Sequence, residues 1–236
     1  MSPILPRIRI LLALCAAPLA AHAQERIAAP TAMYPVGAGP AEISNAKSIS
    51  EANRGRMAGA EFARCIASRS AKRVDAVLAM PNGDAYNRAL VGLADDYCLS
   101  GGQLRFDSNL FRGALFVQLY RQRSAAEAKG KAWSRSLAPF DPGAPASPVE
   151  FGQARLLSFA DCVVRRNPAF AREVVLLPTA SPGQENAIRQ LKNDLAPCFP
   201  AGSTMTLSKP VLEGALAEIL YRTPAASLTP AAQEKK

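Results

Sequence analysis

Histidine, zinc-binding patterns and phosphate-binding loops are nearly absent from this sequence. His22 is the only histidine, no two cysteines lie as close as C-x-x-C, and no glycine-rich phosphate loop occurs. Serine and cysteine nucleophiles usually need a histidine base, zinc sites closely spaced cysteines or histidines, and nucleotide sites a glycine-rich turn. If the segment carrying His22 is removed, histidine-dependent hydrolysis is excluded, and zinc and nucleotide chemistry have no support.

Apolar runs long enough to cross a membrane are also missing. The amino terminus instead has Arg7 and Arg9, then the short apolar stretch 10–19, then Ala21-His22-Ala23. This order is typical of a secretory signal peptide with a small-x-small cleavage site. We therefore expect residues 1–23 to be removed and the chain to be periplasmic or secreted.

Clustered charge of one sign is missing too. The net charge of +9 falls to +7 when Arg7 and Arg9 are removed, and no basic run exceeds two residues, as at Arg165-Arg166. Scattered charge favours a basic solvated surface over a nucleic-acid site. We expect no nucleic-acid partner, and no transmembrane segment after cleavage.

The sequence does contain an internal repeat. Residues 62–81 align with 159–178 without a gap, and NLFRGALFVQLYR (109–121) matches PVLEGALAEILYR (210–222). The copies share Phe62/Phe159, Cys65/Cys162, Arg69/Arg166, Gly113/Gly214 and Tyr120/Tyr221. Conserved order and spacing within one chain indicate a tandem duplication.

With these FARC/FADC and GAL-x-x-x-LYR segments, the chain resembles a group of uncharacterised exported proteins of Gram-negative bacteria. Those proteins have duplicated Cys-containing helical units, and the resemblance covers residues 62–121 and 159–222. It implies no activity that could be assigned to this chain.

Each copy is predicted to form about four helices. Capping boxes begin at Ser48 and Ser147, later helices begin at Ser70 and Asn167, and Tyr86–Tyr97 shows one continuous helical period. No convincing alternation of period two occurs, so the predicted class is all-α. The expected segments are signal peptide 1–23, irregular leader 24–47, repeat 48–122, linker 123–146, repeat 147–222 and disordered tail 223–236.

Four cysteines remain after cleavage, an even number that favours disulfides in an exported chain. We expect Cys65–Cys98 and Cys162–Cys198, because a duplicated unit should have been self-sufficient; pairing between copies is the alternative. Each bridge would close a loop of about 35 residues and stabilise the fold by roughly 3–4 kcal/mol.

The remaining repeated residues have structural interpretations. Phe62 and Phe159 are expected core anchors. Gly113 and Gly214 are expected to permit close helix approach, at the disulfide for example, with a ligand contact as the alternative.

Tyr120 and Tyr221 are expected to be buried, each followed by an arginine at the end of its helix. Arg69 and Arg166 are expected to cap the preceding helix; as the alternative, they form a pair of anion contacts. Trp133 is expected to pack across the two copies, or else to anchor a partner.

No catalytic residue, metal site or cofactor is predicted. The conspicuous acidic pair Asp95-Asp96 is interpreted as a solvated face, and Ser44-x-x-Lys47 as a chance match to an acyl-enzyme motif. We expect a non-enzymatic binding or structural module that contacts a protein or envelope component in a groove between the copies. The alternative is a hydrolase of envelope polysaccharide that uses two carboxylates.

Overall fold

The computed structural model describes residues 34–36, 49–81, 83–99, 103–105, 107–135, 137–141, 148–199 and 207–224. The predicted signal peptide, almost all of the leader, and the tail beyond 224 lie outside the described residues.

Helices dominate the described chain, which confirms the all-α class. The first unit contains α2 (Glu51–Arg69), α3 (Ala71–Leu78), α4 (Asp84–Val91), α5 (Asp96–Leu99) and α6 (Ser108–Glu127). The second contains α7 (Pro148–Arg166), α8 (Pro168–Leu176), α9 (Pro182–Leu195), the 3-10 helix η1 (Ala196–Cys198) and α10 (Lys209–Arg222).

One small strand pair was not predicted. β1 (Tyr34–Val36) pairs antiparallel with β2 (Gln103–Arg105), so the leader is not irregular throughout. Neither strand could be predicted, because three residues are too few to show an alternating pattern.

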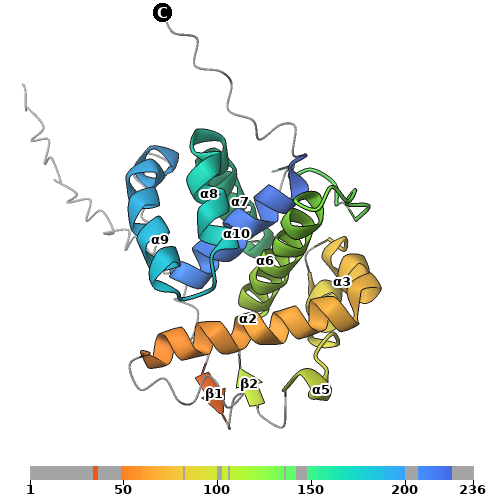
Figure 1. Ribbon diagram of the computed structural model, residues 1–236. Helices are drawn as coiled ribbons and strands as arrows, with labels where there is room; N and C mark the ends of the chain where they lie inside the picture. Colours follow the sequence, from red (N-terminus) through yellow and green to blue (C-terminus); the bar gives the residue numbers. More distant parts are fainter. Residues whose placement is uncertain are drawn as a thin grey trace, which may run out of the picture.

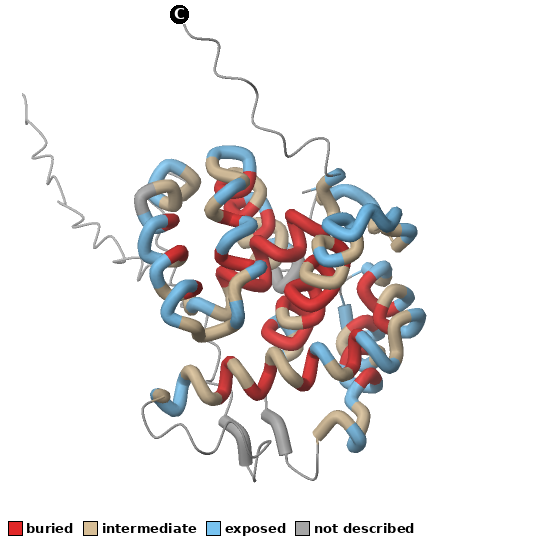
Figure 2. Tube along the Cα trace, viewed as in Figure 1, coloured by how far each residue is buried: buried red, intermediate tan, exposed pale blue. Residues whose placement is uncertain are grey.

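Helices α6 and α10 form the centre of the molecule (Figure 1). They pack most extensively on each other, while α2 packs on α6 and α7 packs on α10. Buried residues concentrate on this central pair (Figure 2). The fully buried side chains include Leu115, Phe116 and Leu119 of α6 and Leu216, Ile219 and Leu220 of α10. Both GAL segments therefore build one shared core; their origin by duplication stays a prediction.

Gly113 and Gly214 lie against each other where α6 and α10 cross. A Cβ atom on Gly214 would stand 2.6 Å from the Cα atom of Gly113, and one on Gly113 would stand 2.9 Å from the Cα atom of Gly214. Such distances fall below any normal contact, so the crossing needs glycine on both helices. The close approach expected from the sequence is present, with the two glycines as each other's partners.

The disulfides follow the within-copy pattern. Cys65 of α2 is bonded to Cys98 of α5, and Cys162 of α7 is bonded to Cys198 of η1. The repeated aromatic anchors are buried beside them: Phe62 and Phe159 are each 2% exposed, and the Phe159 ring packs on Phe199. Each bridge fixes the first helix of its unit to the chain that precedes the central helix.

Some predicted helix boundaries are wrong. The period over Tyr86–Tyr97 predicted one helix, but α4 ends at Val91, Gly92 follows as its C-cap, and α5 starts separately at Asp96. Asp95 starts it, because its carboxylate accepts a hydrogen bond from the backbone N–H of Tyr97. The ring of Tyr97 is consequently exposed rather than part of a buried face.

Two further corrections concern helix ends. Helix α2 is capped by Ser50, whose hydroxyl accepts from the backbone N–H of Asn53, and not by Ser48, which lies outside the described residues. Helix α6 continues to Glu127, beyond the predicted boundary at 122, so Arg121 lies inside the helix and not at its end.

Candidate functional site

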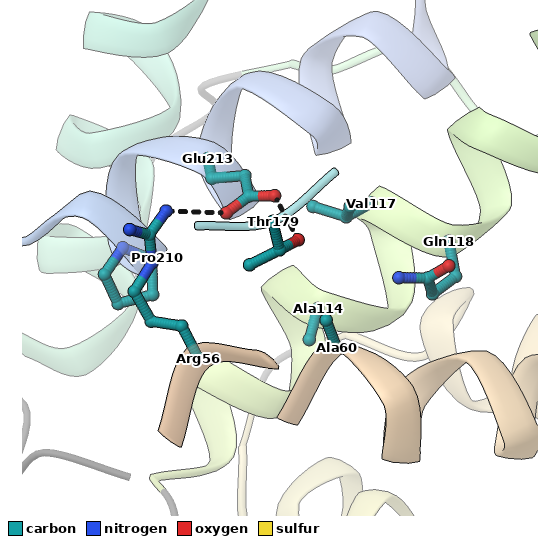
Figure 3. Close-up of a pocket in the computed structure, with 8 residues that line it drawn as sticks. All are labelled: Arg56, Ala60, Ala114, Val117, Gln118, Thr179, Pro210 and Glu213. Carbon is teal, nitrogen blue, oxygen red and sulfur yellow. Dashed lines mark hydrogen bonds and ion pairs between the residues drawn. The ribbon is translucent and has the colours of Figure 1, made fainter. Parts of the chain in front are cut away.

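A small pocket opens where the two units meet (Figure 3). Its cavity volume is about 30 Å³. From the first unit it is lined by Arg56, Ala60, Ala114, Val117 and Gln118, and from the second by Thr179, Pro210 and Glu213. The walls of the pocket come from α2, α6, α10 and the α8–α9 loop.

One face of α6 forms the longest wall. Ala114, Val117 and Gln118 follow helical spacing, and Arg121 continues the same face by one further step. The Gln118 residue is only 6% exposed, and its amide has no hydrogen-bond partner within the described part of the chain. The amide atoms are nevertheless not among the fully buried polar atoms that lack a partner, so the end of Gln118 is open to solvent.

Glu213 is the buried carboxylate of the site. Its Oε1 atom accepts hydrogen bonds from the Thr179 hydroxyl at 3.1 Å and from Arg121 at 3.3 Å. Its Oε2 atom lies 3.5 Å from Nη2 of Arg56. Burial raises the pKa of Glu213 above its usual value, although Arg121, Arg56 and hydrogen bonds from neighbouring groups act to lower it. The neighbouring groups therefore compensate the burial of this carboxylate only in part.

Arg56 reaches the site from α2 and joins three groups of the second unit. Beside its contact to Glu213, it donates to Oε1 of Glu185 at 2.7 Å and to Oε1 of Gln184 at 2.6 Å. Its Nε atom is buried and has no partner among the described residues. Glu185 also pairs with Lys209; despite desolvation, these two cations lower the pKa of the Glu185 carboxyl.

Arg121 holds the α8 end of the pocket in place. It donates to the backbone carbonyls of Val175 at 2.7 Å and Leu177 at 2.5 Å, which are orphan acceptors at the end of α8. The same guanidinium contacts Thr179 at 3.2 Å. Burial lowers the pKa of Arg121, an effect that the nearby Glu213 opposes. An arginine expected to interact with its own helix end instead caps a helix of the other unit.

A second buried ion pair joins α6 to α10, and neither of its residues lines the pocket. Glu218 accepts two hydrogen bonds from Arg112, one of them 2.8 Å long, and a third from Arg222 at 3.0 Å. Arg112 also donates to the Tyr86 hydroxyl at 2.7 Å and stands over the Phe116 ring. Burial acts to lower the pKa of Arg112, but the charge and hydrogen bonds of Glu218 and Tyr86 raise it overall.

The sequence-predicted anion contacts do not meet at the pocket. Arg69 pairs with Asp95 at 3.5 Å and lies over the Tyr97 ring at 4.0 Å, and Arg166 is an exposed residue at the end of α7. Neither residue lines the pocket between the units.

The remaining residues singled out in the sequence do not line the pocket. Tyr120 and Tyr221 are each 3% exposed, which agrees with their expected burial. Trp133 packs edge-on against Tyr221, with ring centroids 6.5 Å apart. The conspicuous pair Asp95-Asp96 lies outside the pocket, at the start of α5.

Sequence reasoning missed the polar residues of the pocket. Ser181 caps α9 by accepting from the backbone N–H of Gln184, while the Gln184 side-chain amide donates to the Val174 carbonyl and accepts from Arg56. A usable signal existed in the GAL segments, where Arg112 and Glu213 place a charge directly before the crossing glycine of an apolar helix. Charge at such a position predicts a buried ionic contact.

Among the described residues, no group of three or more histidine, cysteine, aspartate or glutamate side chains could hold a metal ion. Comparisons with known proteins found no matching family model, no similar curated protein and no similar solved structure.

Proposed function

We propose that this chain is an exported binding module of the cell envelope, and that its contact site is the pocket between the two helical units. The observation that carries the proposal is the composition of this pocket. Five lining residues come from the first unit and three from the second. The buried Arg56 has an Nε atom without a partner among the described residues, and the Gln118 amide makes no hydrogen bond within that part of the chain.

Export is supported indirectly. The two disulfides are compatible with an oxidising compartment outside the cytoplasm. Within the described ranges, no helix has both the length and the apolar character required to cross a bilayer.

The lining of the pocket favours binding over carboxylate-dependent hydrolysis. Glycoside hydrolysis usually needs two carboxyl groups across the scissile bond. Glu213 is the one acidic residue that lines this pocket. Glu185, the nearest further carboxylate on the same arginine, is held by Arg56 and Lys209.

Site-specific photo-crosslinking in a Gram-negative bacterium that exports the chain tests this proposal. The photoreactive residue replaces Pro210, which lines the pocket in the first turn of α10. A matched position is Pro168, which starts α8 and does not line the pocket. We expect a discrete crosslinked product from position 210 alone. Equal crosslinking at 168, or none at 210, would contradict the proposal.

A further inference from the structure

Two large apolar side chains are exposed on neighbouring helices of the first unit. Val91, the last residue of α4, is 68% exposed, and Tyr97 of α5 is 69% exposed. Among the described residues, these are the two most exposed of the large apolar side chains. Transfer of both side chains out of water into an apolar phase would be favourable.

Two arginines bring these apolar residues to one surface. Arg73 of α3 donates a hydrogen bond of 2.8 Å to the backbone carbonyl of Gly92, which directly follows Val91. Arg69, at the end of α2, lies over the Tyr97 ring at 4.0 Å. Because the two arginines are only four positions apart, at the junction of α2 and α3, they hold both ends of the α4–α5 segment beside them.

The charge of this surface is mainly positive. Four exposed cations belong to it or adjoin it in the chain: Arg69, Lys72, Arg73 and Arg88. Arg88 shares a face of α4 with Val91, which follows three residues later. Asp95 is already paired with an arginine of this surface. Even when Asp96 and the more distant Asp84 are counted with it, four cations exceed three carboxylates. We call this set the α4–α5 surface.

An anionic bilayer fits both properties of the α4–α5 surface. Tyrosine rings are favoured where water meets an apolar phase, and arginine pairs well with phosphate oxygens. A saccharide would give no favourable contact to Val91. Figure 1 shows α5 at the outer edge of the molecule, where a flat layer can approach it.

We propose that the α4–α5 surface binds an anionic phospholipid bilayer, with Val91 and Tyr97 inserted among the headgroups and the arginines on lipid phosphates. Arg69, an anion-contact candidate from the sequence, then has this role, whereas Arg166 does not. None of these residues lines the pocket between the units. The inference therefore adds a second contact surface and does not depend on the first.

Vesicle cosedimentation tests the inference on the oxidised chain from Gln24 onward. One set of vesicles contains equal parts of phosphatidylglycerol and phosphatidylcholine, and the other contains phosphatidylcholine alone. We expect binding to the anionic vesicles to be at least about tenfold tighter at low salt, and to weaken when added salt screens the charges. Equal binding to both sets of vesicles would overturn the proposal.

Matched variants link lipid binding to this surface. Tyr97→Ser should weaken binding to anionic vesicles by about tenfold or more, and Arg69→Gln by about fivefold. Phe151→Ser and Arg166→Gln remove an exposed aromatic ring and an exposed arginine from α7, and they should leave binding nearly unchanged. Losses as large in these control variants would overturn the assignment to the α4–α5 surface.

A variant with tighter binding separates the proposal from loss of folding. Asp96→Asn removes a negative charge from the surface and should strengthen binding to anionic vesicles severalfold, a gain that misfolding cannot produce. Absence of this gain would contradict the proposal. A photoreactive residue at position 97 should crosslink to lipid in cells. A discrete crosslinked protein there, in place of lipid, would indicate a protein-docking surface and would also overturn the proposal.

Discussion

Two buried glutamates on the same helix, Glu218 and Glu213, have opposite surroundings. Glu218 is enclosed by Arg112 and Arg222, and every contact among them is short. Glu213 has contacts between 3.1 and 3.5 Å and lines a pocket. Arg112 and Glu213 occupy matching positions directly before the crossing glycines. Opposite charges at matching positions of two similar segments thus give one closed ion pair and one open one.

The largest predicted effect separates the two glutamates. Glu218→Leu leaves Arg112 buried without its carboxylate, and we expect the unfolding free energy to fall by about 3–5 kcal/mol. Glu213→Leu should cost clearly less, because Glu213 is already poorly compensated. The double variant Arg112→Met with Glu218→Leu should recover part of the loss. Urea denaturation measures all three, and equal costs for the two single variants would remove the distinction drawn above.

The disulfides test whether the two units are equivalent in stability. They close loops of similar length, with sequence separations of 33 and 36. Replacing both cysteines of either bridge by serine should lower the unfolding free energy by about 3–4 kcal/mol in each case. Denaturation under non-reducing conditions measures the two losses. A much larger loss in one unit would show that the bridged elements of the other unit are held mainly by packing.

The helix crossing gives the next largest effect. Gly214→Ala places a Cβ atom against the backbone of Gly113, and we expect a loss of about 1–3 kcal/mol as the helices separate. Gly152 of α7 is the matched control, since a Cβ atom there meets nothing within 4 Å. Gly152→Ala should be neutral or stabilising by up to about 1 kcal/mol. Thermal unfolding that ranks these variants in the reverse order would contradict the role of the crossing.

The smallest effect concerns the pH dependence of Glu213. Because the folded-state pKa of Glu213 is raised, the folded protein binds more protons than the unfolded chain above about pH 4.3, and this group's contribution to stability falls as pH rises. Glu213→Gln removes that dependence. The stability of the variant relative to the parent should increase with pH until Glu213 is fully ionised. A difference that is constant from pH 4 to pH 8 would contradict the raised pKa.

Features set by local sequence were predictable, while features set by contacts between distant segments were not. The all-α class followed from helical periodicity, and the Cys65–Cys98 and Cys162–Cys198 pairs followed from their repeated positions. The end of α4 at Gly92 was missed because the apolar spacing continues across this residue, although the helix does not. Periodicity reports which side chains share a face and says little about where a helix stops.

The pocket could not be predicted because its residues come from distant parts of the sequence. Arg56 and Gln184 are 128 positions apart, and neither has a counterpart of the same type in the aligned unit. Repetition directed attention to the shared residues Arg69 and Arg166, which do not line the pocket. In this chain the candidate site lies where the two units differ.

The extension of α6 beyond residue 122 makes the halves interdependent. Arg123, buried in that extension, donates to the backbone carbonyls of Tyr221 and Thr223 at 3.1 Å each. A fragment cut at 122 would leave the end of α10 with unbonded acceptors, so separately expressed halves should reassociate only when the first half extends through Glu127.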